Sequence, residues 1–324
     1  MKRLALPLLL LAACASSPTT LRTEDAPEEA SRELTLQQAE QRRRDFQNVL
    51  IRLDQGMESY SKARSNRGNL RADEQMEKLE KLIREMVLDI GPQEVKAGMP
   101  RREPGENFRR LQAVAADGSK PEEQAIALAA LGFCGQTEMM PTILQGAQLA
   151  DPVLVQRAVF GLAILRAPAT PPGVLASIIE NEKLGEMSRT QAAWALYEVQ
   201  DVSDHKEQIV GVWKRLLTEK RDSLPAGVIV QAVRGLGLSR DKAQTELAAS
   251  FLKHQVPKVR EAAAVATGRL NAQTHVEDLL AMIGPSEAVP NVRLAARKAL
   301  QELAGQDDYG YDVSAWRKAF DRGR

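Results

Sequence analysis

The sequence predicts an all-α protein in which an N-terminal helical hairpin precedes a solenoid of stacked helix pairs. Three observations support this fold class. Apolar residues recur at steps of three and four in two stretches between residues 34 and 90. From Pro121 onward, a pattern of small residues and leucine returns every 31 to 40 residues, a period typical of helical arrays. Aromatic residues make up only 4% of the chain, whereas strands favour aromatic and β-branched residues.

Composition and charge exclude several other classes of protein. The 324 residues carry 44 Lys+Arg and 43 Asp+Glu, a net charge of +1, so the basic excess of a general nucleic-acid binder is missing. Hydrophobic residues make up 44%, enough for a sizeable core. Two cysteines, Cys14 and Cys134, cannot form a disulfide framework. Because His205, His254 and His275 lie far apart in the sequence, we expect no metal site and no cofactor.

The first fourteen residues have the order of a bacterial export signal. A short positive segment precedes an apolar run from Leu4 to Leu11, which is shorter than the ~20 residues needed to span a bilayer. We therefore interpret residues 1–13 as a signal peptide. The tetrad Leu11-Ala12-Ala13-Cys14 resembles the bacterial lipobox, which implies cleavage before Cys14 and a diacylglyceryl group on its thiol. The alternative is an ordinary signal peptide with a chance cysteine.

The resemblance to lipoproteins also has a consequence for location. The residue after Cys14 is Ala15 rather than Asp, which by that resemblance implies sorting to the outer membrane, facing the periplasm, in a Gram-negative cell. We expect residues 14–33 to be the lipidated N-terminus and a flexible tether, because they are rich in Ser, Thr, Pro and charge and lack apolar periodicity.

The stretch 34–90 predicts an antiparallel, coiled-coil-like hairpin of two helices with a turn at 65–69. We expect the Arg42-Arg43-Arg44 run to be a solvated face, and residues 91–104 to be a linker. The hairpin could also oligomerise. Its seams consist of Leu36, Ala39, Phe46, Leu50, Leu53, Met57 and Tyr60, and of Met76, Leu79, Ile83, Met86 and Ile90.

The repeat within 105–324 has a fixed register. Position zero falls at Pro121, Pro152, Glu186, Ala226, Pro257 and Pro290. Position six is always Ala, position nine is Ala or Gly, and position ten is Leu except at Thr267. Positions six and nine lie on one helical face, where small residues let a neighbouring helix approach closely. Each such helix precedes a second apolar segment, so two helices per repeat would bury a continuous core.

The repeat resembles the HEAT and HEAT-like (PBS-lyase type) family. Its Asp-Pro-x-Val-Arg-x-x-Ala opening is matched closely at residues 256–263 and 289–296, which contain Arg260 and Arg293. We expect these arginines to tie neighbouring repeats through acidic residues or carbonyls rather than to bind a ligand. The chain ends in Tyr311-Asp312-x-x-x-Trp316, similar to the tail of some bacterial HEAT-repeat proteins. We expect Trp316 to belong to a capping helix; the alternative is a ligand-binding role.

No motif points to catalysis. We expect Cys134 to be a buried, inert thiol and the three histidines to lie at exposed helix ends. We therefore expect a lipoprotein, not an enzyme, that acts as an interaction scaffold or adaptor for protein partners in the envelope. We expect the solenoid surface to bind protein partners whose identity is unknown, and the lipid on Cys14 to bind the membrane. We expect no nucleic-acid partner. The alternatives are a structural envelope protein that oligomerises through 34–90, and a HEAT-like lyase or enzyme accessory protein.

Overall fold

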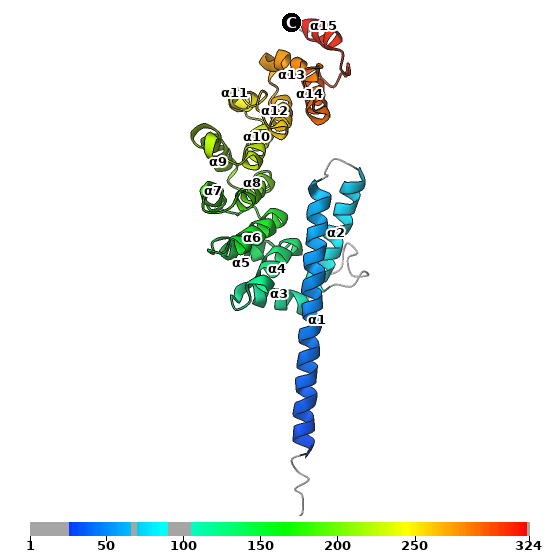
Figure 1. The fold of residues 1–324 in the computed structure, drawn as a ribbon, viewed down its shortest axis with the longest axis vertical. Coiled ribbons are helices and arrows are strands. Elements are labelled where there is room, and N and C mark those ends of the chain that lie inside the picture. Colours follow the sequence, from blue (N-terminus) through cyan, green and yellow to red (C-terminus); the bar gives the residue numbers. More distant parts are fainter. Residues whose placement is uncertain (1–25, 66–69, 90–104, 323–324) are drawn as a thin grey trace, which may run out of the picture. The chain divides into compact units, whose positions relative to one another are not determined.

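The computed structural model describes residues 26–65, 70–89 and 105–322, and these residues form an all-α structure (Figure 1). They contain fifteen α-helices and five short 3-10 helices, and no strand. In this part of the chain no helix is both long enough and apolar enough to cross a membrane. Cys14, the signal peptide and the expected linker 91–104 lie outside the described residues, as does most of the turn expected at 65–69.

Helix α1 (Ala26–Ser65) begins inside the stretch 14–33 that the sequence predicted to be a flexible tether. The sequence of these first helical residues is mostly polar. Apolar periodicity, which set the predicted start at residue 34, carries no signal in such a polar segment. The chain forms two compact units, of which one ends at Asn48 and the other begins at Val49.

Within the second unit, α1 is followed by α2 (Leu70–Leu88). The two predicted seams contribute buried residues here: Leu50, Leu53 and Met57 on α1, and Ile83 on α2. Gly56 brings the two helices close, since a Cβ atom at this position would lie 3.2 Å from Cγ1 of Ile83. The predicted pair of helices is therefore present, and the part from Val49 onward has an apolar core.

Six helices carry the repeat, and the position taken as zero is the first helical residue of every one of them. We call these helices the inner row, because they lie on the side of the repeats that residues 49–65 contact. They are α4 (Pro121–Leu131), α6 (Pro152–Leu165), α8 (Glu186–Gln200), α10 (Ala226–Ser239), α12 (Pro257–Arg269) and α14 (Pro290–Leu303).

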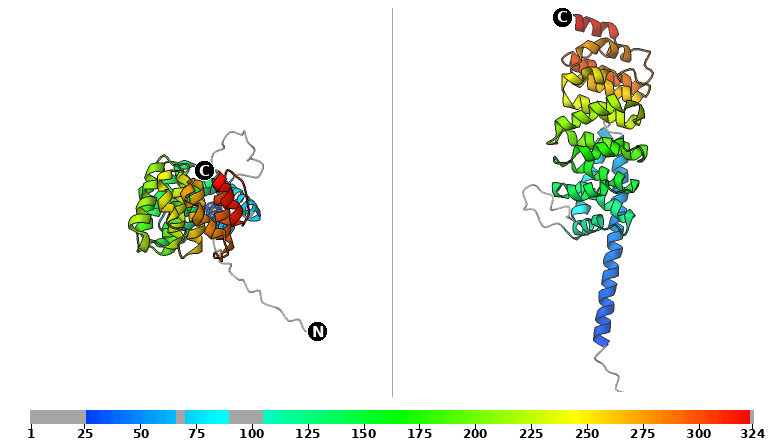
Figure 2. Two further views of the ribbon diagram at one scale, coloured as in Figure 1. Left: turned by 90° about the horizontal axis from the view of Figure 1, so that it is seen from above. Right: turned by 90° about the vertical axis from the view of Figure 1, so that its left-hand side faces the viewer.

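A second set of helices forms an outer row, and each packs against the inner helix that follows it (Figures 1 and 2). Helix α3 (Glu106–Ala116) precedes the first repeat. The outer row comprises α5 (Met140–Ala147), α7 (Pro172–Glu180), α9 (Lys206–Glu219), α11 (Thr245–Ala249) and α13 (Val276–Ile283). The 3-10 helices are η1 (Gly132–Cys134), η2 (Thr137–Met139), η3 (Arg221–Ser223), η4 (Lys242–Gln244) and η5 (Gln273–His275).

The small residues of the register lie where successive inner helices meet. The alanines at position six are fully buried in all six repeats, and so are the residues at position ten. At position nine the backbones come so close that a Cβ atom on Gly161 would lie 2.5 Å from the carbonyl oxygen of Leu128. The all-α solenoid predicted from the spacing is therefore confirmed, together with the faces that pack in it.

The last helix, α15 (Val313–Arg322), closes the array against α13. The Trp316 side chain is fully buried, and its Nε1 donates a hydrogen bond of 3.0 Å to the carbonyl oxygen of Gly310. Its ring stacks on Phe320 at a centroid distance of 6.1 Å. The indole of Trp316 is therefore part of the core that α15 and the residues before it form.

Candidate interaction surface

In four of the six repeats, position three of the register holds a polar side chain that ties the repeats together. Gln124 Nε2 donates to the carbonyl oxygen of Ala115 at 3.0 Å, and Arg293 Nε donates to that of Ile283 at 3.3 Å. Arg189 is buried, and its Nε donates to the carbonyl oxygen of Ile179 at 2.7 Å. Its Nη2 donates to a carbonyl oxygen in η3. These side chains donate hydrogen bonds to backbone carbonyl oxygens at the ends of the preceding segments. Without them, these oxygens would be shielded from water and would have no hydrogen-bond donor.

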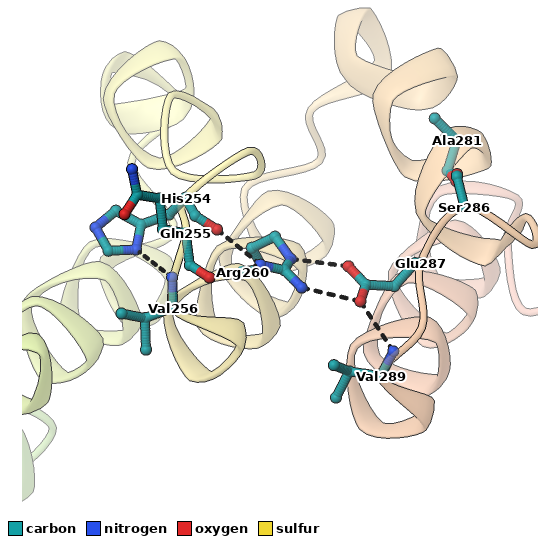
Figure 3. Close-up of polar contacts among 8 residues, drawn as sticks. All are labelled: His254, Gln255, Val256, Arg260, Ala281, Ser286, Glu287 and Val289. Atoms are coloured by element: carbon teal, nitrogen blue, oxygen red, sulfur yellow. Dashed lines mark hydrogen bonds and ion pairs between the residues drawn. The ribbon is translucent and has the colours of Figure 1, made fainter.

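Arg260, the fourth of these residues, links its own repeat to the next one (Figure 3). Its Nη1 donates to the carbonyl oxygens of His254 and Gln255 at 2.8 and 3.0 Å. Its Nε and Nη2 form a bidentate pair with the Glu287 carboxylate at 2.8 and 2.9 Å. This pair lowers the pKa of Glu287, whose Oε1 also accepts from the backbone N–H of Val289 at the start of α14. The structure thus gives Arg260, like Arg293, the tying role expected from the sequence.

The sequence-predicted thiol and two of the histidines lie in separate parts of the repeats. Cys134 is buried at the end of η1, and this burial raises the pKa of its thiol. His205 is half-buried at the start of α9, and Nδ1 of the half-buried His254 accepts from the backbone N–H of Val256. The structure therefore corrects the expectation that the histidines are exposed: all three are half-buried, and the ring of His254 lies 6.1 Å from that of Phe251. Among the described residues, no three His, Cys, Asp or Glu side chains gather where they could hold a metal ion.

His275 differs from the other histidines because it lies between two carboxylates. Its Nδ1 is 3.1 Å from Asp278 and its Nε2 is 3.2 Å from Glu246, while Lys253 lies 2.9 Å from the other carboxylate oxygen of Asp278. Burial alone would lower the pKa of His275, but the hydrogen bonds to Asp278 and Glu246 outweigh burial and raise it. The folded protein therefore favours the imidazolium.

We expect this histidine to make stability depend on pH. The pKa of His275 is higher in the folded state than its ordinary value of about 6.5. Its contribution to the free energy of unfolding is therefore fully present below about pH 6.5 and is lost as the pH rises through the pKa of the folded state. The difference in unfolding free energy between the wild type and His275→Gln should therefore be larger at pH 5.5 than at pH 8.5. Urea titrations at both values measure it, with His205→Gln as the control. An equal or larger difference at pH 8.5 would contradict the assignment.

The inner row carries a second set of side chains, which hold residues 49–65 of α1. Arg157, at position five of α6, forms an ion pair of 2.7 Å with Asp54. Ten residues further along α1, the guanidinium of Arg64 lies over the ring of Trp194 on α8, 3.5 Å from its centroid. On α2, Arg84 Nε donates to a carbonyl oxygen of η1 at 3.2 Å. The inner row therefore binds a helix of its own chain through both polar and apolar contacts.

Aromatic side chains form the apolar centre of this contact. Tyr60 packs edge-on against Phe133, with ring centroids 5.3 Å apart, and against Phe160 at 6.4 Å. Phe160 in turn lies 5.8 Å from Trp194. Edge-to-face aromatic pairs contribute about 0.5–1.5 kcal/mol each beyond the area they bury. Phe160 and Trp194 both occupy position eight of the register, so one row of side chains across the repeats forms the contact surface.

The same surface continues beyond α8 with different side chains. Position eight is Arg234 on α10, Val265 on α12 and Lys298 on α14, and position twelve of α12 is Arg269. Together with the partly exposed Leu294 of α14, we call these residues the distal strip. Arg234 lies 3.9 Å from a carboxylate on α12, whereas Arg269 and Lys298 form no ion pair with any residue in the described part of the chain. The same face also carries two carboxylates, Glu261 at position four of α12 and the exposed Glu302 at position twelve of α14, so the three cations of the distal strip exceed the carboxylates beside them by one. Apolar side chains lie among these charges.

This surface was not predicted from the sequence. The repeat is recognisable at positions six, nine and ten, where small residues and leucine recur, whereas the residue type at position eight changes from repeat to repeat. A signal was present nonetheless, since two of the thirteen aromatic residues of the chain fall at position eight. The contact with α1 could not be found in this way, because Tyr60 and Phe160 lie 100 residues apart.

The described residues form an all-α solenoid of paired helical repeats. No protein-family model matches the chain, and no curated protein matches it. Similar solved structures include an engineered protein with 16% identity, which covers 61% of this chain and 96% of its own, at a TM-score of 0.45. Another is the complex of CpcE and CpcF of phycocyanin lyase from Nostoc sp. PCC7120, with 16% identity, 75% and 89% coverage and a TM-score of 0.39. A third is human deoxyhypusine hydroxylase in complex with glycerol, with 15% identity, 84% and 96% coverage and a TM-score of 0.30.

Proposed function

We propose that this protein is a membrane-anchored interaction scaffold that binds protein partners through the inner row of its solenoid. The observation that carries the proposal is that the inner row already binds one helix, residues 49–65, and that its surface continues over α10, α12 and α14. A surface that holds a helix through Arg157, Phe160 and Trp194 has the chemistry to hold a helix of another protein. The basic and apolar residues of the distal strip extend that chemistry.

The anchor in this proposal is Cys14. The tetrad Leu11-Ala12-Ala13-Cys14 follows a short positive segment and an apolar run at the start of the chain. A diacylglyceryl group together with a further acyl chain holds a protein on a membrane stably, whereas one chain binds only marginally. The anchor would raise the concentration of the solenoid at the envelope, where its partners lie. We place it at the outer membrane, facing the periplasm, in a Gram-negative cell.

A substitution at Cys14 tests the anchor. Cys14→Ser should abolish incorporation of a labelled fatty acid and leave either an uncleaved precursor or a protein that no longer sediments with membranes. Both are measured by gel fluorography and by fractionation after a high-salt wash, and Cys134→Ser serves as the control because it keeps the tetrad. A Cys14→Ser protein that is cleaved and still sediments with salt-washed membranes would overturn the anchor.

Binding is tested separately in intact cells. Chemical crosslinking of the native envelope, followed by mass spectrometry, should recover the protein joined to a defined set of envelope proteins at its repeats. An abundant, folded protein that is recovered only in its uncrosslinked form would overturn the scaffold. Oligomerisation through the hairpin, the alternative function, would instead yield crosslinks between two copies. From Val49 onward the seam residues Leu50, Leu53 and Met57 are already buried within one chain, which favours the scaffold.

A further inference from the structure

We propose that the distal strip binds an acidic amphipathic helix of a partner protein. This inference rests on the proposed scaffold function and names the kind of segment that the scaffold takes. Continuity of the surface supports it first. Successive inner helices pack side by side at equal register, so position eight of α10, α12 and α14 extends the row of side chains that holds Tyr60 and Arg64 of α1. What this row holds in the observed contact is an α-helix.

The charge of the strip supports an acidic occupant. In the occupied part of the surface, Arg157 pairs with the carboxylate of Asp54 at 2.7 Å. In the open part, Arg269 and Lys298 are exposed cations without an ion pair among the described residues, and Arg234 has only a distant carboxylate partner on α12, at 3.9 Å. With Glu261 and the exposed Glu302 on the same face, the open part of the surface keeps a net charge of +1. This excess favours carboxylates, and such complementarity selects partners and speeds their association.

The apolar centre of the strip supports an amphipathic occupant. Val265 is partly exposed between the cations, and Leu294 is 40% exposed on the neighbouring helix α14. A strip with apolar side chains flanked by cations fits the two faces of an amphipathic helix, whose apolar residues recur at steps of three and four and whose acidic residues lie beside them. The surface is therefore matched less well by a basic segment or by a nucleic acid, which would leave the apolar centre uncovered.

Site-specific photocrosslinking in the native cells tests the proposal. A photoreactive amino acid replaces Val265 in the full-length chain, and Val210 on the outer helix α9 carries it in a parallel strain. We expect the probe at position 265 to capture a partner, and the crosslinked peptide to come from a helical segment rich in Asp and Glu. Mass spectrometry of the crosslinked peptide identifies that segment.

Charge reversal supplies the matched comparison. Arg234→Glu combined with Lys298→Glu should reduce the yield of the crosslink about tenfold or more, a loss of roughly 1.4 kcal/mol in binding free energy. Lys214→Glu combined with Lys220→Glu changes the net charge equally on the outer row and should leave the yield unchanged. Circular dichroism and thermal melting verify that both doubly substituted proteins are folded.

Each other outcome overturns a defined part of the proposal. A crosslink from position 265 that survives the Arg234 and Lys298 reversal, or that leads to a basic segment, overturns the acidic helix. A crosslink to a second copy of this chain, or to its own α1, overturns the claim that the strip binds a different protein. Crosslinks from position 210 alone overturn the distal strip and also the inner row as the binding surface of the scaffold. No crosslink from either position, with the protein abundant, overturns the scaffold function itself.

Discussion

Replacing Trp213 with alanine should lower the free energy of unfolding by about 3–5 kcal/mol, because it empties the space of a large core side chain. The Trp213 side chain is fully buried on α9, in the outer row. Its Nε1 donates to Oε1 of Gln200 at 2.8 Å, and Nε2 of Gln200 donates to the carbonyl oxygen of Gly235 at 2.8 Å. The substitution removes the ring and also leaves the Gln200 oxygen without its donor in the core.

Urea denaturation followed by circular dichroism measures this loss. Trp213→Phe separates the two contributions, because it keeps most of the apolar volume and removes only the N–H donor. We expect Trp213→Phe to cost less, about 1–3 kcal/mol, the penalty for an unsatisfied buried polar group. Thr218→Ala, at an exposed position of the same helix, should change the midpoint little. A wild-type midpoint for Trp213→Ala would mean that the packing of α9 is misassigned.

Gly161→Ala should destabilise the protein although alanine is the better helix former. At position 161 the new Cβ would lie 2.5 Å from the carbonyl oxygen of Leu128, a backbone atom that cannot rotate away. Helices α4 and α6 would have to move apart, and overpacking of this kind costs about 1–3 kcal/mol. The gain from replacing a mid-helix glycine is about 0.5–1 kcal/mol and does not offset it.

Gly211→Ala provides the matched control, because Gly211 also lies within a helix but a Cβ there would meet nothing within 4 Å. It should stabilise the protein by about 0.5–1 kcal/mol. The two substitutions are chemically identical and should shift the thermal midpoint in opposite directions. Shifts of the same sign would show that α4 and α6 are not packed backbone to backbone at Gly161.

The repeats were predictable from the sequence for a physical reason. Close helix packing admits only small side chains at the contact, so Ala263, Ala296 and their equivalents recur at a spacing that can be recognised in one dimension. The first helical residue was recognisable for a similar reason, because proline is tolerated in the first turn, where its missing N–H would have had no partner. Local constraints of this kind leave a pattern even without related sequences.

The candidate surface left only a weak pattern, the two aromatic residues at position eight, because it depends on contacts between distant segments. Arg157 appears in the sequence as one of many arginines, and only the folded chain brings it within 2.7 Å of Asp54. The same holds for Arg64 and Trp194, which are 130 residues apart. The start of α1 was predicted too late for a different reason, since a polar helix can form from favourable residues at its N-terminus without any apolar stripe.

The contact of α1 with several repeats has a consequence for how the solenoid unfolds. In an array whose repeats touch only their neighbours, stability is a sum of local terms, and the ends can open independently. Residues 54–64 bridge η1, α6 and α8 directly, so these segments cannot open one at a time without losing contacts to α1. Amide hydrogens from α4 to α8 should therefore exchange with solvent together, as one cooperative block. Those of α10 to α14 should exchange in steps that begin nearer the C-terminus, so that the half of the array carrying the distal strip is also the half that can fray.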